Sequence, residues 1–62
     1  MNKLKVEEQK FLGAEEVAKI MDVSPVTGYR IIKRLNDELK AQGYITVAGK
    51  ISKRYFYEKV YI

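Results

Sequence analysis

The sequence predicts a mainly α-helical domain with one small β-hairpin, and three stretches support that prediction. In "VSPVTGYRIIKRL", residues 23–35, Ser24-Pro25 is a helix-start signal and apolar residues follow at helical spacing. "AEEVAKIM", residues 14–21, is a shorter stretch of the same kind just before it. Ala48-Gly49 then lies between short runs rich in β-branched residues, which is typical of a tight hairpin turn.

The composition restricts the protein to a few functional classes. Its 62 residues suffice for one domain, which we place at residues 11–62 behind a polar segment, residues 1–10, that forms an arm or a short leading strand. The sequence has no cysteine and no histidine, which removes disulfides, the commonest metal ligand and the commonest general base. Because it also lacks a glycine-rich phosphate loop, we expect no enzymatic activity, no cofactor, and no metal or small-molecule ligand.

Nothing in the sequence predicts membrane insertion or secretion. No apolar run approaches the roughly 20 residues of a membrane span. The first residues, "MNKLKVEEQK", lack the apolar segment of a secretory signal. We therefore expect a cytoplasmic protein.

The positive charge is concentrated in one part of the chain. The formal net charge is +4. Residues 1–23 carry four lysines against five acidic residues, which gives −1, and residues 24–62 carry eight basic residues against three acidic ones, which gives +5. Such a one-sided excess suits a polyanionic partner such as DNA, and its alternative is a charge that serves solubility alone.

The first predicted helix spans residues 14–21. Glu15 and Glu16 lie in its first turn, where the helix dipole favours negative charge. Val17, Ile20 and Met21 recur at helical spacing and give the helix an apolar face. The preceding Gly13 is a tolerable N-cap, although not one of the most favourable residues there.

The second predicted helix spans residues 25–42. Asp22 can adopt the left-handed conformation that a tight turn between the two helices needs. Ser24 then caps the second helix, Pro25 occupies its first position, and Gly43 follows as a left-handed stop. The apolar stripe of this helix consists of Ile31, Ile32, Leu35 and Leu39.

A hairpin over residues 44–51 and a third helix over residues 53–60 complete the prediction. "YITV", residues 44–47, has the composition of a strand, and Lys50-Ile51 begins the return strand after the Ala48-Gly49 turn. The tail "SKRYFYEKVY" is compatible with an alternating strand or with a helix capped by Ser52. We favour the helix, because it places Tyr55 and Phe56 against the core.

The order of these elements resembles a known class of DNA-binding proteins. "LGAEEVAKIMDVSPVTGYRIIK" resembles the helix-turn-helix of bacterial repressors and phage regulators. From about Phe11 onward the chain resembles the small winged helix domains of excisionases and of small regulators of phages and integrative elements. This resemblance implies sequence-specific binding of double-stranded DNA, either in transcriptional control of prophage or mobile-element genes or in DNA bending during excision. It also implies a nucleoid-associated location for the bound protein.

The resemblance assigns roles within the helix-turn-helix. Ala18 falls where the two helices meet, and the positions that fill the space between them are Val17, Met21, Val23 and Ile31. The chain departs from the family at Asp22, where glycine is usual, and at Gly28, where valine or isoleucine is more usual. Glycine inside a helix costs about 1 kcal/mol relative to alanine. Either Gly28 faces Ala18 and permits a close helix crossing, or Tyr44 or a tail aromatic fills the space.

Candidate DNA-binding residues follow from this arrangement. The first two turns of the second helix of such a motif face base edges in the major groove; here they contain Pro25, Val26, Thr27, Tyr29, Arg30 and Lys33. Ser24 caps the helix or binds a phosphate, Val26 can contact a thymine methyl group, and Arg30 is the best candidate for a guanine contact. Lys33 and Arg34 are expected on phosphates. In the wing, Lys50, Lys53 and Arg54 are expected on the backbone or in the minor groove. The alternative is that these charged side chains only keep the protein soluble and bind no DNA.

The aromatic tail offers a second kind of contact. Tyr55 and Phe56 are expected in the core, whereas Tyr57 and Tyr61 are candidates for a homodimer contact or for cooperative assembly on DNA. Stacking of these rings on single-stranded bases is a weaker alternative. A competing function is a protein-binding module, similar to an antirepressor, that grips another regulator through this tail. The sequence leaves the DNA sequence recognised and the oligomeric state open.

Overall fold

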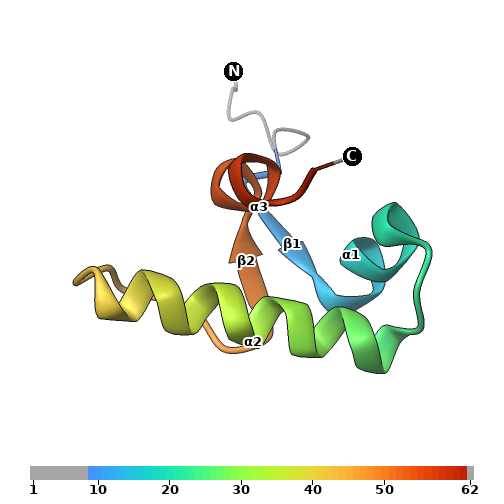
Figure 1. Ribbon diagram of the computed structural model, residues 1–62, viewed down its shortest axis with the longest axis horizontal. Helices are drawn as coiled ribbons and strands as arrows, with labels where there is room; N and C mark the ends of the chain where they lie inside the picture. The colour runs from blue at the N-terminus through green and yellow to red at the C-terminus, as the bar shows by residue number, and fades with distance from the viewer. Residues whose placement is uncertain (1–8, 62) are drawn as a thin grey trace, which may run out of the picture.

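The structure, a computed structural model that describes residues 9–61, confirms the predicted fold class. Its elements in chain order are β1 (Phe11–Gly13), α1 (Ala14–Met21), α2 (Pro25–Ala41), β2 (Lys50–Ser52) and α3 (Lys53–Lys59). Figure 1 shows α2 lying across one end of the small sheet, α3 at its other end and α1 beside β1. Helices therefore dominate, and the one antiparallel sheet stands behind the helix-turn-helix formed by α1 and α2.

The sheet pairs β2 with a different strand from the one predicted. β2 pairs antiparallel with β1, in the register Phe11 with Ser52, Leu12 with Ile51 and Gly13 with Lys50. Leu12 and Ile51 both point into the core and are buried. This central pair explains why the return strand joins residues 11–13, since pairing there buries two large apolar side chains at once.

The predicted strand over residues 44–47 is wrong. Only a single bridge links Val47 to Lys50 across the Ala48-Gly49 turn, where Lys50 N–H donates to the carbonyl of Val47 at 3.1 Å. The tight turn itself is confirmed, and Gly49 has a φ of 78°. The carbonyl of Lys50 also accepts from the side chain of Asn36 at 2.8 Å. Before Val47, residues 44–46 form no strand.

Most of the predicted arm, residues 1–8, lies outside the described residues. The carbonyl of Lys10 accepts from Lys53 N–H at 2.9 Å, which extends the sheet by one hydrogen bond. The strand that follows, from Phe11, was not predicted, because three residues are too few to show an alternating pattern.

The structure of the helix-turn-helix confirms the helix starts and ends that the sequence predicts. α1 has the predicted bounds, and Asp22 ends it in the left-handed region with a φ of 59°. The Oγ of Ser24 accepts from Thr27 N–H at 3.3 Å, so Ser24 caps α2 as expected. α2 ends one residue before the predicted boundary, with Gln42 as its C-cap, and Gly43 follows with a φ of 92°.

Gly28 marks a close crossing of α1 and α2. A Cβ atom on Gly28 would lie 2.4 Å from the backbone oxygen of Ala14 and 3.2 Å from the Cβ of Ala18. The expectation that Gly28 faces Ala18 is therefore confirmed. The alternative, that Tyr44 or a tail aromatic fills the space, is wrong, because the nearest atoms belong to α1 and Tyr44 is exposed.

The core lies between the helices and the inner face of the sheet. Its fully buried large side chains are Val17, Ile32, Ile51 and Phe56. Val23, expected between the helices, is instead 37% exposed, because it follows the left-handed Asp22 and begins the turn. Met21 and Ile31 are only partly buried against the core.

The final segment forms a helix, as we expected, and not a strand. α3 begins after Ser52, whose Oγ accepts from Tyr55 N–H at 3.2 Å. It ends at Lys59, one residue before the predicted boundary, because Val60 is extended. Phe56 is completely buried and Tyr55 packs against the core, as expected. In the part of the chain that the structure describes, no helix has both the length and the apolarity to cross a membrane.

Candidate nucleic-acid interface

The first two turns of α2 present an exposed surface that we call the recognition face: Val26, Tyr29, Arg30 and Lys33. These residues lie three or four apart and therefore share one side of the helix. Val26 is 63% exposed and Tyr29 is 51% exposed, so both side chains are accessible to a partner. Pro25 is exposed beside them, and Thr27 is half-buried towards the cap.

Ser24 is already engaged in the protein. Its Oγ accepts from the backbone N–H of Thr27, and its hydroxyl group lies 3.2 Å from the Thr27 hydroxyl. Both hydroxyl groups remain exposed at the helix start. An anion there would also meet the positive end of the helix dipole.

The cations of α2 differ in their local partners. Lys33 Nζ lies 3.6 Å from Asp37, and Arg34 Nε lies 4.0 Å from Glu38, so both pair one turn along the helix. Among the described residues, Arg30 has no ion-pair partner. Exposed pairs of this kind are worth about 0–1 kcal/mol and are easily exchanged for a phosphate. Among the described residues, Arg30 is therefore the cation of the recognition face without an ion-pair partner.

The turn over residues 47–50, which we call the wing turn, lies directly beside the recognition face. A Cβ on Gly49 would be 3.8 Å from the Cε1 of Tyr29, so the tyrosine ring is in contact range of the turn. A groove of about 330 Å³ separates α2 from the turn. Its lining includes Tyr29, Lys33 and Lys40 from α2, and Thr46, Ala48 and Gly49 from the other side. The structure thus brings two predicted α2 residues together with the wing turn.

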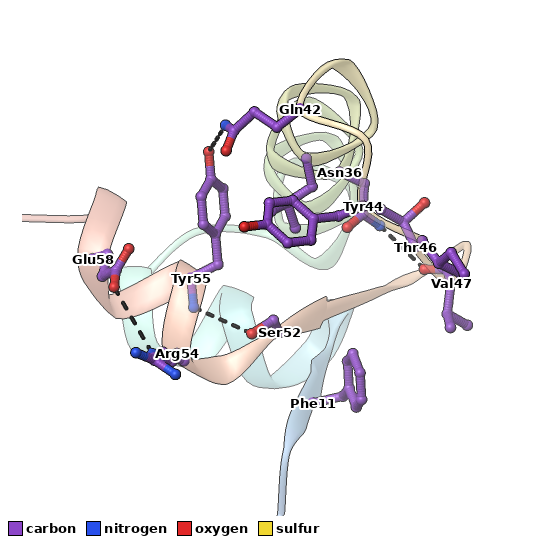
Figure 2. Close-up of a pocket in the computed structure, with 12 residues that line it drawn as sticks. Phe11, Asn36, Gln42, Tyr44, Thr46, Val47, Ser52, Arg54, Tyr55 and Glu58 are labelled. Carbon is purple, nitrogen blue, oxygen red and sulfur yellow. Dashed lines mark hydrogen bonds and ion pairs between the residues drawn. The ribbon is translucent and has the colours of Figure 1, made fainter.

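The predicted wing cations do not all lie at the wing turn. Lys50 follows Gly49 directly, and it is exposed at the start of β2. Lys53 and Arg54 lie beyond the other end of that strand, in the first turn of α3. Arg54 Nε lies 4.0 Å from Glu58 in the same helix, as Figure 2 shows. Of these three cations, only Lys50 is therefore adjacent to the wing turn and so lies near the recognition face.

Glu16 links the start of α1 to the positive charge of β2. Its carboxylate accepts from Gly13 N–H at 2.8 Å and from Gln9 Nε2 at 2.6 Å. The Gly13 hydrogen bond, then that of Gln9, and then the charges of Lys50 and Lys53 lower the pKa of Glu16 from its ordinary value of 4.5. This carboxylate stays ionised at neutral pH and partly offsets the positive charge around Lys50.

One contributor to this region, Asn36, and one role of another, Tyr29, were missed by the sequence analysis. Asn36 is 6% exposed, and its side-chain amide donates to two backbone carbonyls of the wing turn. A signal was available, because Asn36 follows Leu35 and lies four residues after Ile32, within the apolar stripe of α2. Tyr29 was treated as a base-facing residue, and its contact with Gly49 adds a packing role.

A second groove lies on another side of the wing turn. It encloses about 420 Å³, and Figure 2 shows its lining, which includes Phe11, Tyr44, Val47 and Tyr55. Tyr55 is fixed there by donating its hydroxyl hydrogen to Glu38 at 2.9 Å. Elsewhere, Tyr57 is 47% exposed and Tyr61 is fully exposed, so neither belongs to the core.

The sequence comparisons agree with this architecture. The ICEBs1 excisionase of Bacillus subtilis strain 168 is 39% identical to this chain over 49 residues, which span 79% of this chain and 77% of that protein. No protein-family model matches the sequence, and no solved structure matches it. With identity at this level over most of both proteins, the chain belongs to the family of the ICEBs1 excisionase.

Proposed function

We propose that this protein is an excisionase-like architectural factor that binds double-stranded DNA in a sequence-specific way. The observation that carries the proposal is that Tyr29 of α2 and Gly49 of the wing turn line the same groove, so that the exposed start of α2 and the wing turn form one surface. A helix that enters the major groove can then be flanked by a wing on the adjacent backbone. The identity to an excisionase supports the same role.

Within α2, each residue of the recognition face has a distinct task. Arg30 donates to the O6 and N7 acceptors of a guanine, because its guanidinium has the matching fork of donors and lacks a competing partner among the described residues. Val26 packs against a thymine methyl group. Lys33 and Arg34 exchange their intrahelical carboxylate partners for phosphates, and Ser24 holds a phosphate at the helix start.

In the wing, Lys50 supplies the main contact with the DNA backbone, because it lies beside the turn that meets α2. Lys53 and Arg54 contribute to the longer-range positive field from the start of α3. Neutralising all three should lower affinity and flatten its salt dependence while leaving sequence preference mostly intact. The change Lys50→Ala alone should produce most of that effect.

The protein acts through assembly on DNA rather than through catalysis. A single module of this size covers few base pairs and, alone, has difficulty in reaching the affinity of typical specific complexes. Neighbouring copies bound side by side recover that affinity, and the exposed Tyr57 and Tyr61 provide the contact between them. The resulting array changes the path of the DNA during excision.

A second candidate function is that of a protein-binding module. The observation that favours it is the groove lined by Phe11, Tyr44, Val47 and Tyr55, since exposed apolar surface of this kind commonly marks a protein contact. Such a module needs no affinity for duplex DNA.

Selection from a pool of duplexes with randomised centres distinguishes the two candidates. The full-length protein is expected to enrich a defined sequence, and the selected duplex should then be titrated at 50 and 200 mM salt. A DNA-binding protein loses affinity steeply between the two concentrations, with a slope set by the phosphates that it neutralises. If no sequence is enriched and duplex binding stays at background at both concentrations, the DNA-binding proposal is wrong.

A further inference from the structure

Asn36 occupies an unusual place for a polar side chain. It lies on the buried side of α2 between Ile32 and Leu39, and it is the one buried polar residue within the described part of the chain. Burying an amide is unfavourable unless its hydrogen bonds are replaced. The contacts that replace them therefore indicate why an asparagine stands at this position.

Both donors of the Asn36 amide are used on one turn. Nδ2 donates to the carbonyl of Val47 at 3.1 Å and to the carbonyl of Lys50 at 2.8 Å. Figure 2 shows Asn36 reaching from α2 to Val47. Since both partners are carbonyls, the end of the side chain that faces them must be the NH₂ group.

The same two carbonyls belong to the residues that close the wing turn. Lys50 N–H donates to Val47, which is one of the two backbone hydrogen bonds that an antiparallel pair can exchange. The carbonyl of Lys50 accepts from Asn36 as well, since a carbonyl oxygen has two lone pairs. The side chain of one α2 residue thereby ties both ends of the turn to the helix.

We propose that Asn36 is a positioning residue that holds the wing turn at a fixed place beside the recognition face, so that Lys50 reaches the DNA backbone while α2 is in the groove. This inference rests on the proposed DNA-binding function. Tyr29 supports the same turn from its outer side through Gly49, but a ring contact restricts the turn less than two directed hydrogen bonds. Without the amide, the turn keeps its Val47–Lys50 bond but loses its two hydrogen bonds to α2.

The test is a double-mutant cycle on DNA binding that combines Asn36→Leu with Lys50→Ala. Each variant is titrated with the selected duplex at 50 and 200 mM salt. One phosphate contact corresponds to a slope of about 0.9, so a fourfold change in salt alters affinity by about 3.5-fold per contact. Lys50→Ala should therefore reduce the salt effect of the wild-type protein by about 3.5-fold, and should have almost no further effect in the Asn36→Leu background.

Gln42→Leu is the matched control. It removes an amide from the end of α2 that contacts the Tyr55 hydroxyl and does not touch the wing turn. In that background, Lys50→Ala should act as it does in the wild-type protein. An equal effect of Lys50→Ala with and without Asn36 would overturn the inference. Failure of the wild-type protein to bind any duplex would overturn the proposed function and, with it, the DNA role of Asn36.

Asn36→Leu leaves two carbonyls without their side-chain donor, and Asn36→Asp provides a variant of nearly the same shape that also lacks both donors. If neither variant folds, hydrogen exchange of the wild-type protein decides the matter. The Asn36 side-chain amide and Lys50 N–H are expected to exchange at least tenfold more slowly than the exposed Gln42 side-chain amide. Exchange of the Asn36 amide at the rate of Gln42 would show that the turn is not held, and would overturn the inference.

Discussion

Replacement of Gly28 by alanine tests the helix crossing on which the recognition face depends. In an ordinary helix interior, this change stabilises a protein by about 1 kcal/mol, because alanine has the higher helix propensity. Here the new Cβ would lie 2.4 Å from the carbonyl oxygen of Ala14, whereas an ordinary carbon–oxygen contact is roughly 3.3 Å. The two helices must therefore separate by roughly 0.9 Å, and a gap of that size forfeits a quarter to a half of the dispersion energy of the contacts that line it.

The expected outcome is a net loss of stability. Overpacking of this kind costs about 1–3 kcal/mol, and the contact with a backbone atom, which cannot rotate away, places Gly28→Ala at the upper end of that range. After the propensity gain, the free energy of unfolding should fall by about 2 kcal/mol. For a chain of 62 residues, whose total stability is roughly 3–9 kcal/mol, this is a large fraction.

Urea unfolding followed by circular dichroism measures the loss, with Gly13→Ala as the matched control. A Cβ on Gly13 would meet nothing closer than Glu16 Oε1 at 3.8 Å, so Gly13→Ala should change stability by less than about 1 kcal/mol. Adding Ala18→Gly to Gly28→Ala should not restore stability, because the shortest contact is with the backbone of Ala14. A Gly28→Ala protein as stable as the wild type, or more stable, would refute the close crossing.

Three further predictions concern DNA reading, assembly and pH. Arg30→Ala should weaken binding to the selected duplex by about 1–3 kcal/mol and hardly affect random duplexes, and equal losses on both would remove Arg30 from base recognition. Tyr57→Ser combined with Tyr61→Ser should lower the cooperativity of footprints but spare single-site binding; loss of folding would instead contradict the exposure of these rings. The pKa of Glu16 is lower in the folded protein than its ordinary 4.5, so its contribution to stability is complete above that pH and is lost as the pH falls through the folded value. Urea unfolding should accordingly show the difference between wild type and Glu16→Gln shrinking in acid, and a constant difference would contradict this origin.

The helices could be predicted because their signals are local. Ser24-Pro25 caps α2, Asp22 and Gly43 take the left-handed conformations expected of them, and Ser52 starts α3. Each depends on a few neighbouring residues whose preferences act wherever the segment lies. The close approach of the helices at Gly28 could also be predicted, since a glycine inside a helix needs a compensating contact.

The sheet and part of the site could not be predicted in this way. Residues 44–47 have strand propensity, but propensity does not specify a pairing partner, and in the structure only Val47 of this segment forms a bridge, with Lys50. β1 lies far from β2 in the sequence, so only the folded chain shows their pairing. Likewise, Lys53 and Arg54 lie away from the wing turn because β2 ends at Ser52 and both residues belong to α3. Their positive charge alone does not indicate where that strand ends.

The two strands run into the helices that follow them without an intervening residue: β1 ends at Gly13 where α1 begins at Ala14, and β2 ends at Ser52 where α3 begins at Lys53. An inserted or deleted residue at either joint would shift the strand by one position and turn Leu12 or Ile51 away from the core. In the connection over residues 42–49, by contrast, a change in length would leave both joints and the register of β1 with β2 intact. A longer connection here would reshape the surface between α2 and the wing turn without moving Leu12 or Ile51 out of the core.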